Sequence, residues 1–358
     1  MNIPKITDFD ISSKKVIVRG DVDLGDEIRE GDEVKLNTII PTIKYLIQKE
    51  CKIIIIGHRG RPADAEALAG EARRIKFENL SLRRVSELLS GLLEKEVKFV
   101  DEILGEKVSG EVKNLGSSDI SMLENLRFDS REEANDENFA RELASLGEIY
   151  VNEAFSSSHR AHASIVGIPK FLPHAAGFRL VEEVEHLSRV IENPERPLIF
   201  LISGVKEDKL EMINGIADKA DKIWVGGRLP EYMEKITSYK LQTTNEKLMV
   251  AQLNPDKEDI TIRSIENFET EIKRAKTIVL AGVVGKYEDE GHRQGTKRVF
   301  EAVADSSAYK VAGGGDTEAA IAMFNLVNKF DWISVGGGAM LEFLAKGTLP
   351  GIEALVQV

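Results

Sequence analysis

Basic side chains stand at the ends of apolar runs throughout the first half of the chain. Their places are Arg19 after VIV, His58, Arg59 and Arg61 in GHRGRP after IIIIG, Arg127 in MLENLRF, and Arg160 in VNEAFSSSHRAHAS. The carboxyl ends of the strands in an open α/β sheet border one crevice, so these side chains are expected to converge there. Arginine pairs its planar fork with two phosphate oxygens at once. The spacing therefore predicts a site for a phosphate or a phosphorylated acid.

Each of these arginines, taken alone, also fits a simpler interpretation as a solvated side chain at the end of a loop. That alternative weakens because four segments and two histidines repeat the same placement. Two acidic residues, Asp21 and Asp23, share the loop that follows Arg19 and belong to the same candidate site.

Glycine-rich turns follow apolar runs in the second half. They are Gly226-Gly227, Gly282, Gly313-Gly314-Gly315 and Gly336-Gly337-Gly338. A glycine turn that opens a helix presents backbone N–H groups and the positive end of the helix dipole to phosphate. Glycine equally serves close packing of a helix on a strand. Asp316 and Thr317 favour the phosphate interpretation, because the carboxylate can hold Mg²⁺ and the threonine can cap the helix. Lys206, after LIFLIS, can neutralise a transferring group.

The elements that must position these residues alternate between β-branched runs and longer amphipathic stretches. Apolar runs predict strands at 16–19, 53–57, 97–100, 120–123, 148–151, 198–203, 222–227, 277–282, 309–315 and 332–338. Helical patterns are found at 36–49, 81–95, 134–146, 207–219, 294–304 and 317–328. This alternation is typical of βαβ units with a parallel sheet. The predicted fold class is α/β, with two doubly wound, Rossmann-like parallel-sheet domains joined by a hinge helix.

The length of 358 residues favours two domains, because single cores usually split beyond roughly 250 to 300 residues. The stretch GIPKFLPHAAG at 167–177 is interpreted as a domain edge, and LVEEVEHLSRVIE at 180–192 as a helix joining the domains. We expect domains at 1–176 and 197–345, a hinge at 177–196, and a tail at 346–358 that returns toward the first domain.

Composition limits the classes of partner. Hydrophobic residues make up 42% and charged residues 30%, with no run of 18 apolar residues and no leader at Met1, so we expect a cytoplasmic protein without a membrane partner. The net charge of −12 argues against nucleic acid, although a local basic cleft can still bind a small anion. The single cysteine, Cys51, precedes KIIIIG and is predicted to be a buried free thiol.

With these segments in order, the chain resembles the phosphoglycerate kinase family along nearly its whole length. Family blocks such as VRVDFN, HLGRP, LLENLRF, VNDAFGTAHRAHAS, GGGDT and STGGGASLE have counterparts in the same order. The match is strongest in VNEAFSSSHRAHASIVGIPKFLP, MLENLRF and VAGGGDTEAAI. The resemblance implies reversible phosphoryl transfer between 1,3-bisphosphoglycerate and ADP, giving 3-phosphoglycerate and ATP, in glycolysis and gluconeogenesis.

The resemblance also assigns a half-site to each domain. On the first, it implies a glycerate-phosphate site of Arg19, Asp21, Asp23, His58, Gly60, Arg61, Arg127 and Arg160. On the second, it implies a nucleotide site of Gly204, Lys206, Lys209, Gly282, Glu288, Gly314, Gly315, Asp316 and Thr317, with Asp316 holding the Mg²⁺ that accompanies ATP or ADP. It assigns catalysis to Lys35, Lys206, Gly314 and Gly337. Two half-sites imply closure about the helix 180–192 and the tail after Leu349, which excludes water, in a protein expected to be a monomer.

Several segments depart from the family pattern. The arginine that the family places ahead of its AALPTI-like helix aligns with Lys35, which keeps the charge but not the fork. VRVDFN is VRGDVD here, so Asp23 replaces an amide. GGAKVSDK is SGVKEDK, one residue shorter between Lys206 and Lys209, and NGPMGVFE is AGVVGKYE. GGGM is GGRLPEYM at 226–233, and the chain between Tyr232 and Thr277 is shorter than in typical family members. Because these changes cluster in the nucleotide half, the preferred nucleotide is left open.

Three hypotheses about function follow. The first is an active phosphoglycerate kinase of a divergent, archaeal-like lineage. The second is a degenerate paralogue that binds a phosphorylated acid and regulates another process. The third is a kinase on the same scaffold for a related carboxylate or phosphate acceptor, because a fold does not fix its substrate.

Overall fold

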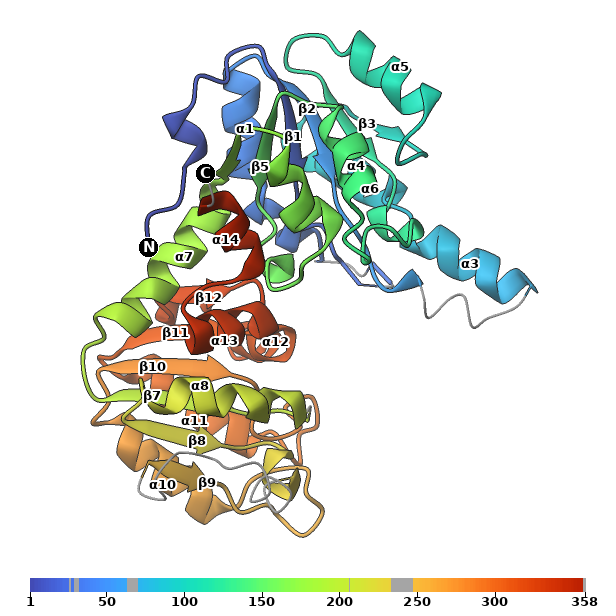
Figure 1. The fold of residues 1–358 in the computed structure, drawn as a ribbon. Coiled ribbons are helices and arrows are strands. Elements are labelled where there is room, and N and C mark those ends of the chain that lie inside the picture. Colours follow the sequence, from blue (N-terminus) through green and yellow to red (C-terminus); the bar gives the residue numbers. More distant parts are fainter. Residues whose placement is uncertain (26, 29–31, 63–69, 206, 233–246, 357–358) are drawn as a thin grey trace. The chain divides into compact units, whose positions relative to one another are not determined.

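The computed structural model describes residues 1–25, 27–28, 32–62, 70–205, 207–232 and 247–356. The chain divides into two compact units (Figure 1). Unit 1 comprises Met1–Glu183 and Leu349–Val358, and unit 2 comprises Val184–Thr348. The boundary falls inside helix α7 (Phe178–Glu192), so this helix contributes residues to both units. The predicted tail at 346–358 is also divided between the units: residues 346–348 belong to unit 2, and unit 1 includes the residues from Leu349 onward.

Unit 1 is built on a six-stranded sheet with the order β3-β4-β2-β1-β5-β6, and every neighbouring pair is parallel. Its strands are β1 (Lys15–Arg19), β2 (Lys52–Ile56), β3 (Val97–Val100), β4 (Ile120–Leu123), β5 (Ile149–Asn152) and β6 (His174–Ala176). The first five confirm the predicted strands. Residues 167–177, interpreted as a domain edge, include β6, which pairs with β5 inside unit 1.

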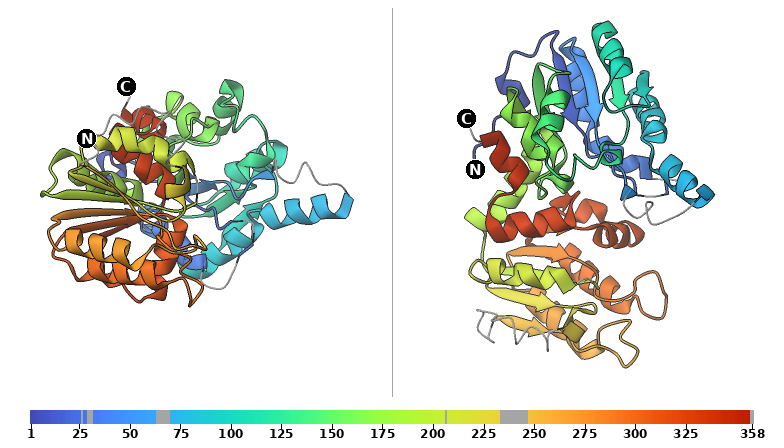
Figure 2. Two further views of the ribbon diagram at one scale, coloured as in Figure 1. Left: turned by 90° about the horizontal axis from the view of Figure 1, so that it is seen from below. Right: turned by 45° about the vertical axis from the view of Figure 1, so that its right-hand side comes forward.

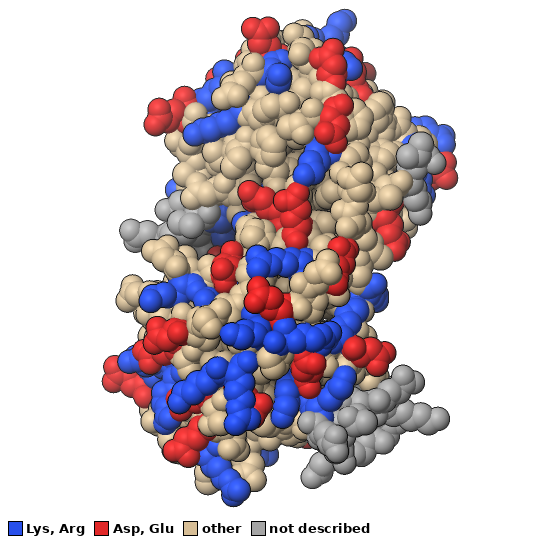
Figure 3. Space-filling model, turned by 90° about the vertical axis from the view of Figure 1, so that its left-hand side faces the viewer, with Lys and Arg blue, Asp and Glu red and all other residues tan. Residues whose placement is uncertain are grey.

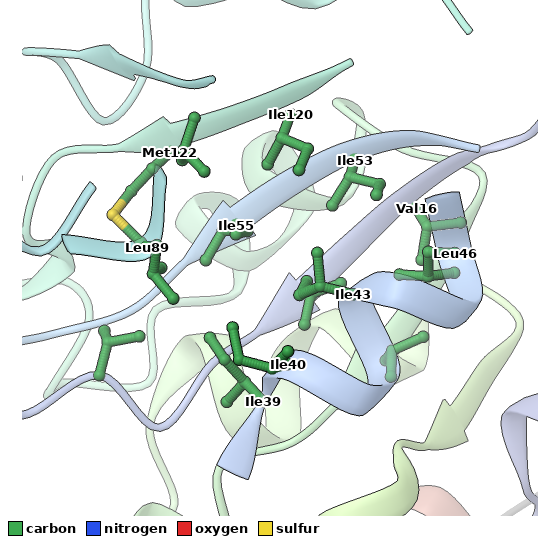
Figure 4. Packing of buried hydrophobic residues seen from close by; sticks show 14 of the residues in the cluster. Val16, Ile39, Ile40, Ile43, Leu46, Ile53, Ile55, Leu89, Ile120 and Met122 are labelled. Carbon is green, nitrogen blue, oxygen red and sulfur yellow. The ribbon is translucent and has the colours of Figure 1, made fainter. Parts of the chain in front are cut away.

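Unit 1 also contains α-helices between and after its strands. They are α1 (Ile40–Gln48), α3 (Gly70–Leu80), α4 (Arg83–Leu93), α5 (Glu106–Asn114), α6 (Glu137–Ala144) and α14 (Pro350–Val356). Ile43 of α1 and Leu89 of α4 pack beside Ile53 and Ile55 of β2 (Figure 4). All of Ile53 to Ile56 are buried, and alternate side chains of a strand point to opposite faces, so both faces of the sheet are covered.

Two local features of unit 1 bear on the sequence predictions. The predicted helix at 36–49 is a 3-10 helix, η2 (Asp32–Thr38), followed by α1, whose start is fixed by Pro41 in its first turn. Cys51 is buried, as predicted; burial raises the pKa of its thiol to about 11, and Sγ lies 3.1 Å from the carbonyl oxygen of Ile11.

Unit 2 is built on a second six-stranded parallel sheet, with the order β12-β11-β10-β7-β8-β9. Its strands are β7 (Leu198–Ile202), β8 (Lys222–Val225), β9 (Leu248–Val250), β10 (Thr277–Ala281), β11 (Tyr309–Gly313) and β12 (Trp332–Ser334). Figure 2 shows both sheets from two further sides. The expectation of two parallel-sheet α/β domains is confirmed, although the sequence did not predict β9.

The helices of unit 2 are α8 (Met212–Ala217), α10 (Ile262–Ile272), α11 (Gln294–Asp305), α12 (Gly315–Met323) and α13 (Gly337–Lys346). The rings of Trp224 on β8 and Phe268 on α10 stack with centroids 4.6 Å apart, and this pair fixes α10 against the sheet. In the described parts of both units, no helix combines the length and the apolar character that crossing a bilayer requires.

Candidate active site

Arg19, the last residue of β1, is fully buried in unit 1 and its guanidinium is held on three sides. Nε donates to Ser164 Oγ at 2.9 Å, and Nη1 donates to the carbonyl oxygen of Gly20 at 2.6 Å. Nη2 lies 2.8 Å from His58 Nδ1. A buried arginine beside an imidazole favours the form of that imidazole in which Nδ1 accepts, so the pair is organised around one fixed positive charge.

His58 is buried directly after β2, where it faces several cations. Burial, and after it the charges of Arg19, Arg127 and Arg160, hold the pKa of His58 well below its ordinary value, so the ring is neutral near pH 7. On its other side, Nε2 lies 3.5 Å from Asp23 Oδ2. Asp23 Oδ1 accepts hydrogen bonds from the backbone N–H groups of Gly25 and Gly60, each at 3.0 Å. Asp23 therefore ties the loop after β1 to the loop after β2.

Arg127 is the strongest indication of an anion site in unit 1. Its side chain is only 3% exposed; Nη1 donates to the carbonyl oxygen of Gly60 at 2.7 Å, and Nε lies 3.1 Å from Glu133 Oε1 without an aligned hydrogen bond. Within the described residues, Nη2 is buried and has no hydrogen-bond partner. Burial and the neighbouring charge of Arg160 lower the pKa of Arg127 to about 10, which leaves it charged at pH 7. A buried charge with an unused donor calls for an anion.

Arg160 and His162 complete the cluster from the segment after β5. Arg160 Nε donates to His159 Nε2 at 3.2 Å. Burial, followed by the charges of Arg127 and Arg160, lowers the pKa of His162 to about 4. The structure therefore brings Arg19, His58, Arg127 and Arg160 together, as predicted. We name these four residues and His162 the basic cluster.

Three polar residues that the sequence reasoning missed support the basic cluster from beneath. Glu132 is fully buried and accepts from the backbone N–H of Ser164 at 2.9 Å and from Ser164 Oγ at 2.5 Å. Burial raises the pKa of Glu132, while Arg19 opposes the shift. Buried Asn125 accepts from the backbone N–H of Arg127 at 3.1 Å and donates to the carbonyl oxygen of Arg59 at 2.7 Å. Asn125 and Ser164 lie inside the segments MLENLRF and VNEAFSSSHRAHAS, which was the only sequence signal for them, and Glu132 lies in neither.

Asp21 lies beside the basic cluster and is held by one residue. Ser156 donates to it twice, from Oγ to Oδ1 at 2.7 Å and from the backbone N–H to Oδ2 at 3.1 Å. Burial raises the pKa of Asp21, while these two hydrogen bonds oppose the shift. Gly60 adopts a positive φ of 59°, which lets its carbonyl oxygen meet Arg127. By contrast, Arg61 is exposed, as is Lys35 on η2.

Unit 2 contains a cavity of about 320 Å³ at the carboxyl ends of its strands. Its wall includes residues that follow five adjacent strands: Asp316 after β11, Glu288 after β10, Gly204 after β7, Gly227 after β8 and Lys257 after β9. Its size lies at the lower end of the range for small-molecule pockets. Four predicted nucleotide residues therefore meet at or beside one pocket: Gly204, Glu288, Asp316 and, next to Asp316 in sequence, Gly315.

Gly282 allows β7 and β10 to end close together beside this pocket. It has a φ of 129°, and a Cβ there would lie 2.0 Å from the carbonyl oxygen of Ser203. Lys209 Nζ donates to that oxygen at 2.6 Å and to the carbonyl oxygen of Ala281 at 3.0 Å. Lys209 thus links the ends of β7 and β10 next to Gly204 and Gly282. The phosphate contact expected for Lys209 stays a prediction.

Two glycine turns of unit 2 meet at their backbones. A Cβ on Gly337, the first residue of α13, would lie 2.5 Å from the Cα of Gly314, which precedes α12. Thr317 is buried, and in the described residues its Oγ1 has no hydrogen-bond partner. Two helices of nine and ten residues therefore begin side by side. Their N–H groups and dipoles can stabilise phosphate at this place.

The remaining predicted residues are placed as follows. Lys206 lies outside the described residues. Glu288 is exposed at the pocket wall, and Asp316 is exposed in the first turn of α12. In the described residues, no group of three or more His, Cys, Asp or Glu side chains could hold a metal ion. A single carboxylate such as Asp316 fits a cation that arrives with nucleotide phosphates rather than one that the protein binds alone.

Comparison with known proteins agrees with this geometry. A family model described as phosphoglycerate kinase matches residues 6–254 and 242–347. A phosphoglycerate kinase of Coprothermobacter proteolyticus is 36% identical over 405 residues, covering 99% of each chain, and one of Thermosipho africanus is 37% identical over 401 residues, covering 98% of this chain and 97% of the relative. This chain belongs to the phosphoglycerate kinase family.

Solved phosphoglycerate kinases have a similar structure. The enzyme of Pyrococcus horikoshii OT3 matches with a TM-score of 0.82 at 27% identity, covering 99% of this chain and 98% of the other. The enzyme of Coxiella burnetii matches with a TM-score of 0.80 at 28% identity, covering 99% of each chain. Membership of the phosphoglycerate kinase family makes this protein a kinase, with a nucleotide and other small molecules as substrates. An archaeal-like lineage stays a prediction.

Proposed function

We propose that this kinase transfers a phosphoryl group reversibly between the carboxyl group of 3-phosphoglycerate and ADP or ATP. The observation that carries the proposal is the buried guanidinium of Arg127, whose Nη2 has no hydrogen-bond partner in the described residues and whose surroundings are cationic. A phosphorylated acid bears two negative groups, and the basic cluster supplies bidentate donors for them. A coupled assay with 3-phosphoglycerate, Mg-ATP and other nucleotides tests this function.

Unit 1 would bind and orient the acid. Arg19 and Arg127 are fixed by backbone carbonyls and by Ser164, so they need little reorganisation when the anion arrives. The neutral ring of His58 can donate from one nitrogen while its other nitrogen faces Arg19. Asp21, held by Ser156, would accept from a substrate hydroxyl. These contacts leave the carboxyl end of the acid to react.

Unit 2 would bind the nucleotide, with its phosphates at the start of α12. Asp316 and the N–H groups of the turn at Gly314 would hold the phosphates together with Mg²⁺, which neutralises charge as it builds up on the phosphate oxygens. Lys209 keeps Gly204 and Gly282 in place, so the backbone can lie against the ligand. Lys206, after β7, is proposed to neutralise the transferring group, and Gly337 to present N–H groups to it.

Asp316→Asn is expected to weaken binding of the Mg-nucleotide at least tenfold and to leave the KM for 3-phosphoglycerate nearly unchanged. Loss of a carboxylate weakens a site for a hard cation, and even outer partners of metal sites contribute 10- to 100-fold. Steady-state kinetics at varied Mg-ATP measures the effect. Glu318→Gln is the matched control, because it removes an acid from the same first turn of α12. A change in the KM for 3-phosphoglycerate alone would contradict the assignment.

Substitutions of Lys35 test the catalytic role that we propose for this residue, which stands where the family pattern has an arginine. Lys35→Arg should keep or raise turnover, whereas Lys35→Ala should lower kcat roughly 10- to 1000-fold, the scale for losing one preorganised electrostatic contact. Both KM values should change less than kcat, because the contact strengthens only as charge develops on the transferring group. The measurement is kcat and both KM values for the wild type and the two variants.

Lys44→Ala provides the control for Lys35, since Lys44 is an exposed lysine on the neighbouring helix α1. Equal turnover in the wild type, Lys35→Arg and Lys35→Ala would mean that Lys35 is only solvated. That result would favour the degenerate paralogue. The cytoplasmic location and the monomeric state expected from the sequence stay part of the proposal.

A further inference from the structure

The order of the strands in unit 2 gives the nucleotide pocket a direction. Asp316 and the start of α12 follow β11, at one end of the pocket, whereas Arg228 and Lys257 follow β8 and β9 at the other end. This inference rests on the proposed function, which places the phosphates at α12. A nucleotide with its phosphates there directs its base toward the far end, so the residues after β8 and β9 face the base.

That far end is bordered by two cations joined through one carboxylate. Arg228 Nε donates to Glu231 Oε2 at 2.7 Å, and Lys257 Nζ donates to Glu231 Oε1 at 2.7 Å. The side chains of Arg228 and Lys257 are 49% and 55% exposed, so both keep donors available to a ligand. The pair of hydrogen bonds links the loop after β8 to the loop after β9.

An acceptor stands beside these cations. Glu258 also lines the pocket, and its Oε2 lies 3.7 Å from Lys286 Nζ. The loop that carries Glu258 is fixed, because the backbone carbonyl oxygen of Glu258 accepts a hydrogen bond from the backbone N–H of Lys286 at 2.8 Å. On the other side, the backbone N–H of Arg228 donates to the carbonyl oxygen of Gly204 at 2.9 Å. The base would therefore meet cationic donors and an anionic acceptor on anchored loops.

The polar edges of the two purines differ in how they fit this set. Guanine presents two acceptors, O6 and N7, which a guanidinium can bind together, and its N1–H and 2-amino group can both donate to one carboxylate. Adenine presents an amino group in place of O6, which repels a cationic donor, and it has no second donor for the carboxylate. We infer that this pocket binds guanine nucleotides in preference to adenine nucleotides, and that Arg228 and Glu258 determine the preference.

Calorimetric titration of the full-length protein with GDP, IDP and ADP, each in excess Mg²⁺ and without glycerate substrate, tests the inference. We expect GDP to bind about tenfold more tightly than ADP, since one good bidentate contact discriminates on that scale. IDP has O6 and N1–H but lacks the 2-amino group, so its affinity should fall between the two. Tighter or equal binding of ADP would overturn the inference while leaving the proposed nucleotide site intact.

Two variants assign the preference to residues. Arg228→Met keeps the length of the stem but removes the donors, and it should reduce the GDP to ADP ratio to about one. Glu258→Gln should mainly reduce the difference between GDP and IDP. Arg298→Met is the matched control, because Arg298 binds Glu269 through Nε at 2.8 Å and Nη2 at 2.7 Å and does not line this pocket.

The outcomes are distinguishable. A GDP preference that survives both Arg228→Met and Glu258→Gln would overturn the assignment to these residues. Failure of the wild type to bind any of the three nucleotides would contradict the proposed function itself, and with it the inference. If Arg228→Met does not fold, as seen by circular dichroism, Glu258→Gln decides alone, because its side chain is partly exposed and forms no hydrogen bond within the described residues.

Discussion

Arg127→Met is expected to raise the KM for 3-phosphoglycerate by roughly 30- to 4000-fold. Truncating one partner of a buried, hydrogen-bonded charge pair costs about 2–5 kcal/mol, and each 1.4 kcal/mol is tenfold in affinity. Nη2 of Arg127 is the donor that the structure leaves unpaired, so the bound anion would be its partner. Initial rates at varied 3-phosphoglycerate and saturating Mg-ATP measure the change, while the KM for Mg-ATP should stay within a factor of about three.

The effect on stability separates a binding role for Arg127 from a structural one. Burial and the charge of Arg160 disfavour the charged guanidinium in the free protein, as its lowered pKa shows. Arg127→Met removes that cost but also leaves the carbonyl oxygen of Gly60 without its donor, so the thermal midpoint should change little. Arg127→Lys should recover part of the affinity, because it restores the charge without the fork. Arg131→Met is the control, since Arg131 pairs with Asp129 outside the basic cluster. A large loss of stability with an unchanged KM would contradict the binding role.

Gly282→Ala is expected to lower the free energy of unfolding by about 2–5 kcal/mol. A left-handed conformation costs a residue with a Cβ about 1–2 kcal/mol, and overpacking adds about 1–3 kcal/mol. Both terms apply, because Gly282 has a φ of 129° and its Cβ would lie 2.0 Å from the carbonyl oxygen of Ser203 and 2.9 Å from Lys209 Nζ. Urea denaturation measures the loss, and calorimetric titration should show weaker binding of nucleotide.

Gly291→Ala is the control for Gly282→Ala. It lies between β10 and α11, and its Cβ would meet only Asp289 Oδ1, at 3.4 Å. Its effect on the free energy of unfolding should stay within about 0.5 kcal/mol. Equal stability of the two variants would show that the ends of β7 and β10 can separate without cost. In that case Lys209 would not be needed to hold them.

The sequence predicts most strands of both sheets for one physical reason. Parallel sheets that are covered on both faces need continuous apolar runs, and KIIII in β2, LIFLI in β7 and TIVLA in β10 supply them. The strands that were missed, β6 (HAA) and β9 (LMV), have only three residues each. Neither is followed by a glycine-rich turn such as the one that marks the equally short β12, and both are defined by pairing with β5 and β8.

The candidate site divides in a similar way. Residue type and position predict Arg19, His58, Arg127 and Arg160, because separate segments each place a basic side chain at the end of an apolar run. The buried supports were not predictable. Glu132 and Ser164 are 32 residues apart in the sequence, and their hydrogen bonds form only because the fold brings the two residues together. The direction of Lys209, toward carbonyl oxygens, likewise depends on how closely β7 and β10 end, which glycine content alone does not reveal.

The position of helix α14 in the sequence determines when unit 1 can finish folding during synthesis. The backbone N–H of Gly351 donates to the carbonyl oxygen of Ser158 at 2.8 Å, next to the segment that carries His159 and Arg160. Unit 2 is one continuous stretch, Val184–Thr348, whereas unit 1 also needs the residues from Leu349 onward. A ribosome therefore synthesises all of unit 2 before the final piece of unit 1. Unit 1, which begins first, is completed after unit 2, and the loop bearing Arg160 gains this contact only after all of unit 2 has been synthesised.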